Sequence, residues 1–192
     1  MAVICAGAAV GCSSSSSTPA ASTTTTVTAT ATAPTGTGAA TSTLTSPAGT
    51  AACATSSLHV TQGAPQGYAG GVYQAIVFTN ASGASCTLYG YPGVSLVSAS
   101  HTQIGLAAKR STATPVKLIT LAPGATASAL LQIVDALNFS PSTCDPVKAA
   151  YLRVYPPNQT APVDLANTSE TCSKPVQTLF IQAVKVGSGG SS

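Results

Sequence analysis

The chain has 192 residues, a net charge of +3, and only seven basic and four acidic side chains, the first of which is Lys109. The basic residues are scattered, which excludes the clustered Lys and Arg that nucleic-acid binding requires. No apolar run reaches the 18 or so residues of a membrane-spanning helix, and the length suggests one domain with additional segments.

The N-terminus carries the pattern of a bacterial lipoprotein signal. A short apolar run, Ala2 to Val10, leads to Gly11 and Cys12, and a serine tract follows at once. Val10, Gly11 and Cys12 match the lipobox, in which Leu is commoner at the position of Ala9. We expect residues 1–11 to be a signal segment and Cys12 to be acylated, which would hold the protein on the extracytoplasmic face of the cell membrane.

This segment also departs from a typical signal. Only eleven residues precede Cys12 and none is Lys or Arg, whereas a secretory signal has roughly 15–30 residues and a positively charged start. A translation start further upstream would account for both departures. The alternative is a cytoplasmic protein with an apolar N-terminus.

Residues 12–52 are expected to form a disordered, lipid-anchored tether. Serine, threonine, alanine and proline dominate, and Val27 and Leu44 are the only bulky aliphatic residues. Such a segment cannot bury enough apolar surface to offset the entropy of ordering it. Ser/Thr-rich tracts with proline are also typical of O-glycosylated stalks, and both a glycosylated stalk and an unmodified spacer stay open.

If the chain is exported, the positions of the six cysteines indicate a role for each. Cys5 leaves with the signal and Cys12 takes the lipid, so an even number remains for a disulfide framework. Of three possible pairings we favour the sequential one, in which each bridge would stabilise the fold by about 3–4 kcal/mol. No C-x-x-C spacing is present, so neither a metal nor a cofactor is expected. The predicted bridges are Cys53–Cys86 and Cys144–Cys172.

Residues 53–187 are predicted to fold as an all-β domain, and residues 188–192 as a disordered tail. Alternating apolar and polar residues between turn signals indicate seven to nine short strands, which favours a two-sheet antiparallel immunoglobulin-like sandwich over a closed barrel. Helix signals occur only in residues 140–150, where Asp145 could cap and Pro146 suits the first helical position. Strands are expected at 58–61, 71–80, 85–89, 94–97, 116–121, 126–134, 151–155, 162–165 and 176–186.

Several segments of this domain resemble an actinobacterial family of secreted proteins and lipoproteins with no assigned activity. The Cys-x-Leu-x-Gly-Tyr-Pro block is the most specific of them. The resemblance implies an exported, disulfide-bonded β-domain and brings no catalytic residues. The matching segments are Cys53 with Leu58-His-Val60, Phe78-Thr-Asn80, Cys86-Thr-Leu-Tyr-Gly-Tyr-Pro-Gly-Val94, Leu121-Ala-Pro-Gly-Ala-Thr-Ala127, Cys144, Leu152-Arg-Val-Tyr-Pro-Pro157 and Cys172.

The sequence gives no catalytic motif. His59 faces outward on its strand by parity, His101 lies in a Ser-His-Thr loop, and no G-x-S-x-G motif accompanies the serines. The Gly-rich residues 67–71 precede a strand and not a helix, so a phosphate site at a helix N-terminus is not expected. Asp135 is interpreted as a solvated strand end and Asp145 as a helix cap; Asp164 and Glu170 are the other acids. We expect no enzyme.

The hypothesis that the domain binds a ligand rests on its six tyrosines. A tyrosine offers a flat apolar face and a hydroxyl, which suits a glycan or peptide, although tyrosines near loops also cap core edges. The favoured function is a lipid-anchored envelope binding module, with a glycan or protein partner. The alternatives are a hydrolase, indicated by a cleft with His59 or His101 beside an acid, and a passive structural lipoprotein with a uniformly polar surface. The tyrosines are Tyr68, Tyr73, Tyr89, Tyr91, Tyr151 and Tyr155.

Overall fold

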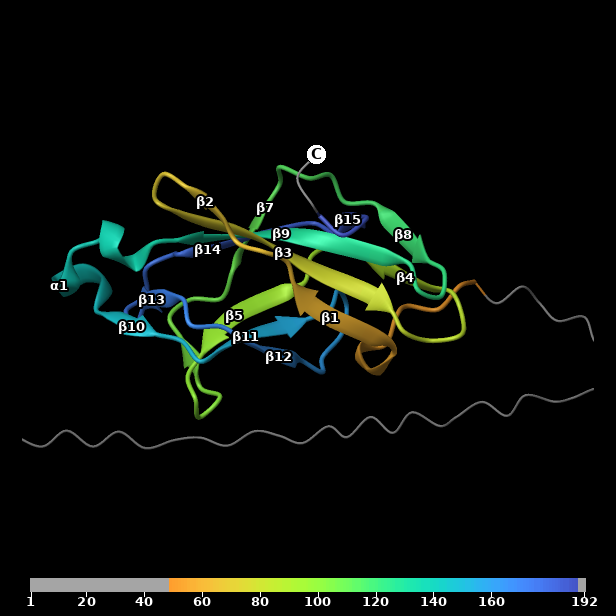
Figure 1. The fold of residues 1–192 in the computed structure, drawn as a ribbon, viewed down its shortest axis with the longest axis horizontal. Coiled ribbons are helices and arrows are strands. Elements are labelled where there is room, and N and C mark those ends of the chain that lie inside the picture. The colour runs from red at the N-terminus through yellow and green to blue at the C-terminus, as the bar shows by residue number, and fades with distance from the viewer. Residues whose placement is uncertain (1–48, 190–192) are drawn as a thin grey trace, which may run out of the picture. The chain divides into compact units, whose positions relative to one another are not determined.

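The computed structural model describes residues 49–189, and almost all regular structure in this range is β (Figure 1). The prediction of an all-β fold of antiparallel sheets is confirmed. Cys12, the signal segment 1–11, most of the predicted tether and residues 190–192 lie outside the described residues.

The largest sheet has the strand order β1-β3-β9-β14-β7, with β2 paired to β3 and β15 paired to β9. All pairings in it are antiparallel except the parallel pair of β7 and β14. Its strands are β1 (Leu58–Gln62), β2 (Gln66–Tyr68), β3 (Gly71–Asn80), β7 (Lys109–Ser111), β9 (Thr126–Val134), β14 (Leu179–Gln182) and β15 (Lys185–Val186).

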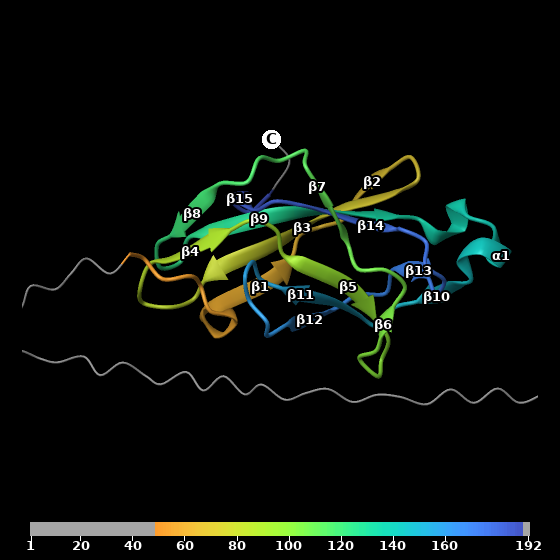
Figure 2. The same ribbon diagram turned by 180° about the vertical axis from the view of Figure 1, so that it is seen from behind.

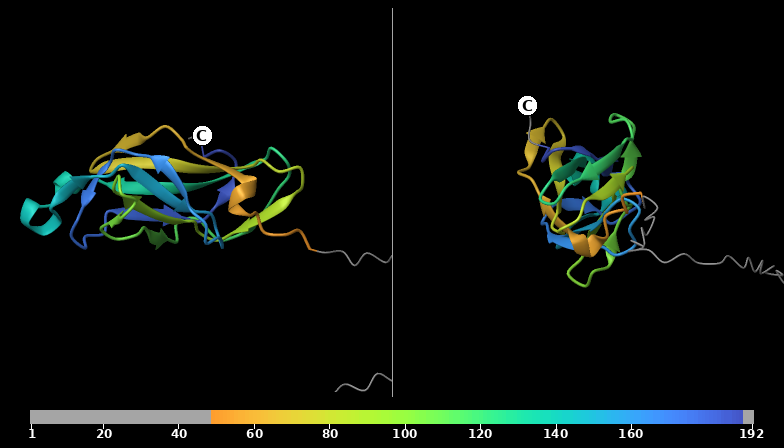
Figure 3. Two further views of the ribbon diagram at one scale, coloured as in Figure 1. Left: turned by 90° about the horizontal axis from the view of Figure 1, so that it is seen from below. Right: turned by 90° about the vertical axis from the view of Figure 1, so that its right-hand side faces the viewer.

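Three smaller antiparallel sheets complete the domain. The four-stranded sheet β12-β11-β5-β6 faces the large sheet, as the views from behind and from below make clear (Figures 2 and 3). The strands are β12 (Val163–Ala166), β11 (Tyr151–Tyr155), β5 (Gly93–Val97) and β6 (Gln103–Ile104), then the pairs β4 (Cys86–Tyr89) with β8 (Leu118–Leu121) and β10 (Pro146–Lys148) with β13 (Glu170–Cys172).

The core lies between these layers and follows from strand alternation. On β3, Ile76 and Phe78 are fully buried, and the residues opposite them on β9 are Ala129 and Ala127. A large side chain thus lies beside a small one, which lets the layers pack without voids. From the facing sheet, Leu96, Leu152 and Val154 join the same cluster.

Both disulfides have the predicted sequential pairing. Cys53–Cys86 and Cys144–Cys172 each bridge two fully or nearly fully buried cysteines. The first bridge fastens the start of the domain to β4, where the Cys53 amide also donates to the Thr87 carbonyl oxygen. Ala52 forms a bridge with Thr87 as well, so the fold begins slightly before the predicted residue 53.

The helix predicted in residues 140–150 is present but lies earlier than expected. It is the single turn α1 (Pro141–Cys144), whose first position is taken by Pro141 and not by Pro146, which opens β10. Asp145 does not cap its start: it ends the helix in the left-handed conformation, with φ 51°, which Asp tolerates better than most residues. Two 3-10 turns are η1 (Thr55–Ser57) and η2 (Ala136–Asn138).

Two other local expectations change. The strand predicted over 176–186 is broken into β14 and β15, because the Val184 amide leaves the ladder and donates to the Gly90 carbonyl oxygen. Asp135 is not merely a solvated strand end, since its side chain accepts from the Leu137 amide and caps η2. Residues 49–189 hold fifteen strands, more than the seven to nine expected, because several have only two or three residues.

Candidate functional site

Three of the six tyrosines line one groove of about 540 Å³, which we call the tyrosine groove. Tyr89 ends β4, Tyr91 follows it, and Tyr155 ends β11. The groove is therefore built where two strands from different sheets finish. Its lining residues are Tyr89, Gly90, Tyr91, Gly93, Arg110, Val116, Tyr155, Pro156, Asn158 and Gln159.

Glycines shape this groove. Gly90 has φ 95°, a left-handed conformation that favours glycine, and it turns the chain between Tyr89 and Tyr91. Gly93 lies directly opposite Tyr155 in the β5–β11 ladder. A Cβ at Gly93 would lie 3.3 Å from the Tyr155 Cβ, so the absence of a side chain gives Tyr155 its room.

Polar groups border the aromatic rings. The Arg110 guanidinium lies 5.4 Å from the centre of the Tyr91 ring, a cation–π distance. Asn158, with φ 60°, donates from Nδ2 to the Tyr89 carbonyl oxygen at 3.3 Å. Within residues 49–189, the hydroxyls of Tyr89, Tyr91 and Tyr155 make no hydrogen bond. By contrast, the hydroxyl of Tyr68, outside the groove, already accepts from Gln132.

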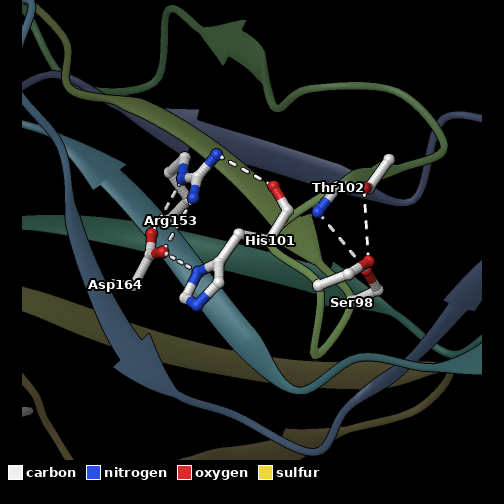
Figure 4. A network of polar contacts seen from close by, with 6 residues as sticks. Ser98, His101, Thr102, Arg153 and Asp164 are labelled. Atoms are coloured by element: carbon white, nitrogen blue, oxygen red, sulfur yellow. Dashed lines mark hydrogen bonds and ion pairs between the residues drawn. The ribbon is translucent and has the colours of Figure 1, made fainter.

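A second group of polar side chains lies on the four-stranded sheet, around Asp164. Arg153 donates from Nε and Nη2 to the two carboxylate oxygens of Asp164, each at 2.8 Å, and from Nη1 to the His101 carbonyl oxygen. His101 Nδ1 donates to Asp164 Oδ2 at 2.6 Å (Figure 4). The imidazole also stacks on the Tyr151 ring. Arg153 and Asp164 are directly opposite residues of β11 and β12.

The charges of this group reinforce one another. Hydrogen bonding from Arg153 lowers the pKa of the Asp164 carboxyl; partial burial opposes this shift, and the His101 bond adds to it. The bond to Asp164 raises the pKa of Arg153 in turn. Asp164 is thus held as a carboxylate that orients the His101 ring.

The His101–Asp164 contact is the histidine–acid pair that hydrolase chemistry needs, and within residues 49–189 no nucleophile is hydrogen-bonded to it. In the described part of the chain, no serine or threonine hydroxyl bonds to the imidazole; Ser98, Ser100 and Thr102 bond to one another. The His101 side chain is 52% exposed and does not line the tyrosine groove. The observed role is to fasten the β5–β6 turn to β11 and β12.

The remaining predicted site residues are dispersed. His59 lies exposed on β1, and Asp145 accepts from the Ser173 hydroxyl. Asp135 and Glu170 border another cavity, of about 440 Å³, beside Tyr68. The Gly-rich residues 67–71 form the β2–β3 hairpin, as expected of a loop before a strand. Among residues 49–189, no three His, Cys, Asp or Glu side chains are grouped as metal ligands.

Sequence reasoning found the tyrosines but not their neighbours. Arg110 lies on a three-residue strand, too short for alternation to reveal. Asn158 and Gln159 follow Pro156-Pro157, a turn signal that places them in a loop without saying what the loop borders. The Arg153–Asp164 pair could have been found by extending the β11–β12 hairpin register from its turn.

Comparison with known proteins identifies a family. A family model described as "Domain of unknown function (DUF4232)" matches residues 53–185, more than half of the chain. The searches of curated proteins and of solved structures found no match. In the described residues, no helix is long and apolar enough to cross a membrane.

Proposed function

The chain belongs to the DUF4232 family, a domain of unknown function, and on that premise we propose that it is a lipid-anchored lipoprotein of the actinobacterial cell envelope whose β-domain binds an envelope glycan in the tyrosine groove. The anchor is Cys12, and the Ser/Thr-rich segment after it is the tether. The anchor is supported by the lipobox pattern of residues 9–12 and by the two disulfides, which are typical of exported proteins.

The grouping of Tyr89, Tyr91 and Tyr155 around one groove carries the glycan proposal. The faces of sugar rings are apolar and their rims carry hydroxyls, so a sugar site needs flat aromatic surface together with hydrogen-bonding groups. The groove supplies both, with tyrosine hydroxyls that make no hydrogen bond within residues 49–189, the Arg110 guanidinium and the amides of Asn158 and Gln159. The alternative function, a passive structural lipoprotein, would not require this arrangement.

Cosedimentation with the protein-free, insoluble glycan fraction of the envelope tests glycan binding. The full chain carrying Cys12→Ser is used, so that a lipid cannot contribute. Tyr91→Ala and Tyr155→Ala should each weaken binding about tenfold, because aromatic contacts buried by a ligand dominate binding energy. Tyr151→Ala is the matched control: it removes a tyrosine from the same strand and the same side of β11, outside the groove.

The control should bind about as well as the parent chain. If Tyr151→Ala weakens binding as much as Tyr155→Ala, or if the parent chain does not sediment with the glycan, the tyrosine groove is not a glycan site.

The anchor is tested separately by metabolic labelling. A fatty acid label should enter the wild-type protein and be absent from Cys12→Ser, because the thiol is the proposed acylation site. Label in the variant would contradict the lipobox interpretation, whatever the outcome of the glycan experiment.

A hydrolase is the second candidate, and the His101–Asp164 contact is the observation that favours it. An enzyme that used this pair would release soluble fragments from the same glycan fraction and would lose that activity in His101→Ala. The binding proposal expects no fragments from either chain.

A further inference from the structure

Exposed apolar side chains gather beside the tyrosine groove. Four of the six large hydrophobic residues exposed in the described chain lie on adjoining segments: Tyr89 on β4, Val116 and Leu118 at β8, and Val186 on β15. Tyr89 and Leu118 are directly opposite residues of the β4–β8 ladder. A cavity of about 380 Å³ joins β8 to β15 and is lined by Thr114, Pro115, Lys117, Leu118, Ile119, Val184, Lys185 and Val186.

We call Val116, Lys117, Leu118, Lys185 and Val186 the β8–β15 patch. Single exposed hydrophobic residues are ordinary on a protein surface, whereas a contiguous group rimmed by polar residues indicates an interaction surface. Leu118 is 66% exposed and Val186 74% exposed, so neither contributes much to the core. Their place in the fold therefore gives them no structural role that a polar residue could not fill.

The charged side chains around the patch are all positive. Lys117 and Lys185 line its cavity, and Arg110 lies in the adjoining groove. The carboxylates of the described chain lie elsewhere: Asp135, Asp145 and Glu170 are at or next to η2, α1 and β13, toward the opposite end of the domain in Figure 1. Asp164 is paired with Arg153 on the four-stranded sheet. The patch thus combines apolar side chains with unopposed positive charge.

The chain enters the domain beside this patch. Ala52 forms a bridge with Thr87 of β4, and β4 pairs with β8, which carries Leu118. The described chain, which starts at Gly49, therefore begins close to β4, the strand that pairs with β8. A membrane anchor on the N-terminal segment would be attached to the domain through this point.

We propose that the β8–β15 patch docks on an anionic lipid surface, with Leu118, Val116 and Val186 inserted at the headgroup boundary and Lys117 and Lys185 on the lipid phosphates. Lysine stems lie along apolar surface while their ammonium groups reach a charged layer, so this residue mixture matches a membrane interface. A protein partner of this patch would not require aliphatic residues surrounded by positive charge alone. The proposed docking surface adjoins the tyrosine groove and shares Val116 with it, but lipid docking does not depend on glycan binding.

Vesicle cosedimentation tests the docking. The full chain carrying Cys12→Ser is mixed with vesicles of phosphatidylcholine alone, or with 30% phosphatidylglycerol, at low and high salt. Binding should require phosphatidylglycerol and weaken as salt rises. Lys117→Gln and Lys185→Gln should each lower the partition constant about fivefold, since a lysine near an anionic surface contributes on the order of 1 kcal/mol.

The apolar contribution has a matched control. Leu118→Ser should lower the partition constant severalfold, whereas Leu137→Ser should leave it unchanged, because Leu137 is equally exposed at 68% but lies on η2. Unfolding midpoints of all variants should match the parent chain, which excludes misfolding. Equal effects of Leu118→Ser and Leu137→Ser would overturn the proposal. So would binding that is independent of phosphatidylglycerol, or a Leu118-dependent dimer in sedimentation velocity.

Discussion

Asp164 is the residue whose ionisation affects the described fold most directly. It accepts two hydrogen bonds from Arg153 and one from His101, and together they join the β5–β6 turn, β11 and β12. These bonds need the carboxylate, because a carboxyl group that carries a proton cannot accept the same set of donors. The acid that sequence reasoning left without a role therefore connects two strands and a turn.

The pKa of Asp164 sets the pH dependence of this contribution. Because the pKa is lowered in the fold, mainly by Arg153, the unfolded chain binds the proton first as the pH falls. The contribution to stability is complete above the ordinary aspartate pKa of about 4 and is lost as the pH falls through the lower folded-state pKa.

Asp164→Asn should therefore lower the thermal unfolding midpoint at pH 7 and have a smaller effect at about pH 3. Thermal unfolding of both proteins, followed by circular dichroism across this range, checks the prediction. A difference between the two that stays constant down to about pH 2 would show that the charge of Asp164 does not contribute.

At the scale of elements, the segment from β6 to β7 depends on a close approach to β13. Gly105 has φ 61°, and a Cβ there would lie within 2.4 Å of the Cys172 carbonyl oxygen. Both the left-handed backbone and the contact with a backbone atom exclude a side chain.

Gly105→Ala should therefore lower the free energy of unfolding by about 1–3 kcal/mol. Gly83→Ala is the control, because a Cβ there meets nothing within 4 Å, and it should change stability little. Urea denaturation of the oxidised proteins measures both. If Gly83→Ala costs as much as Gly105→Ala, close packing at Gly105 is not the cause.

The sequence predicts the long strands well and the short ones poorly. β3, β9 and β11 have the bounds expected from their apolar alternation, over 71–80, 126–134 and 151–155. β7 and β10 were missed because three residues show no period, and their pairing depends on distant partners, as when Lys109 aligns with Phe180. The helix signals also gave the wrong start, because they indicated Pro146 as the first helical residue, whereas the helix begins at Pro141.

The candidate site, too, could be predicted from the sequence only in part. The tyrosines could be singled out by residue type, but Tyr89 and Tyr155 are brought together only by the packing of two sheets. The disulfides were predictable because an even number of cysteines indicates a disulfide framework, and the favoured sequential pairing among the three possible ones is the pairing observed. The Arg110–Tyr91 contact was not, since nothing in a three-residue strand tells where its side chains point.

For the whole molecule, the proposed function gives each part a separate task. Cys12 would anchor the chain, the Ser/Thr-rich segment would space the domain from the membrane, and the β-domain would bind the glycan. The tyrosine groove and the β8–β15 patch adjoin through Tyr89 and Leu118, so a glycan in the groove would lie close to the proposed lipid-docking surface. This arrangement predicts a glycan ligand near the membrane.

The glycan site can be located by following the amide chemical shifts of the chain carrying Cys12→Ser during titration with soluble oligosaccharides released from the envelope glycan. Binding in the tyrosine groove should cause saturable shift changes confined to residues 89–93, Arg110 and residues 155–159, which border the groove. Shift changes centred on His101 and Asp164, on the cavity of Asp135 and Glu170, or on no residue at all would contradict it.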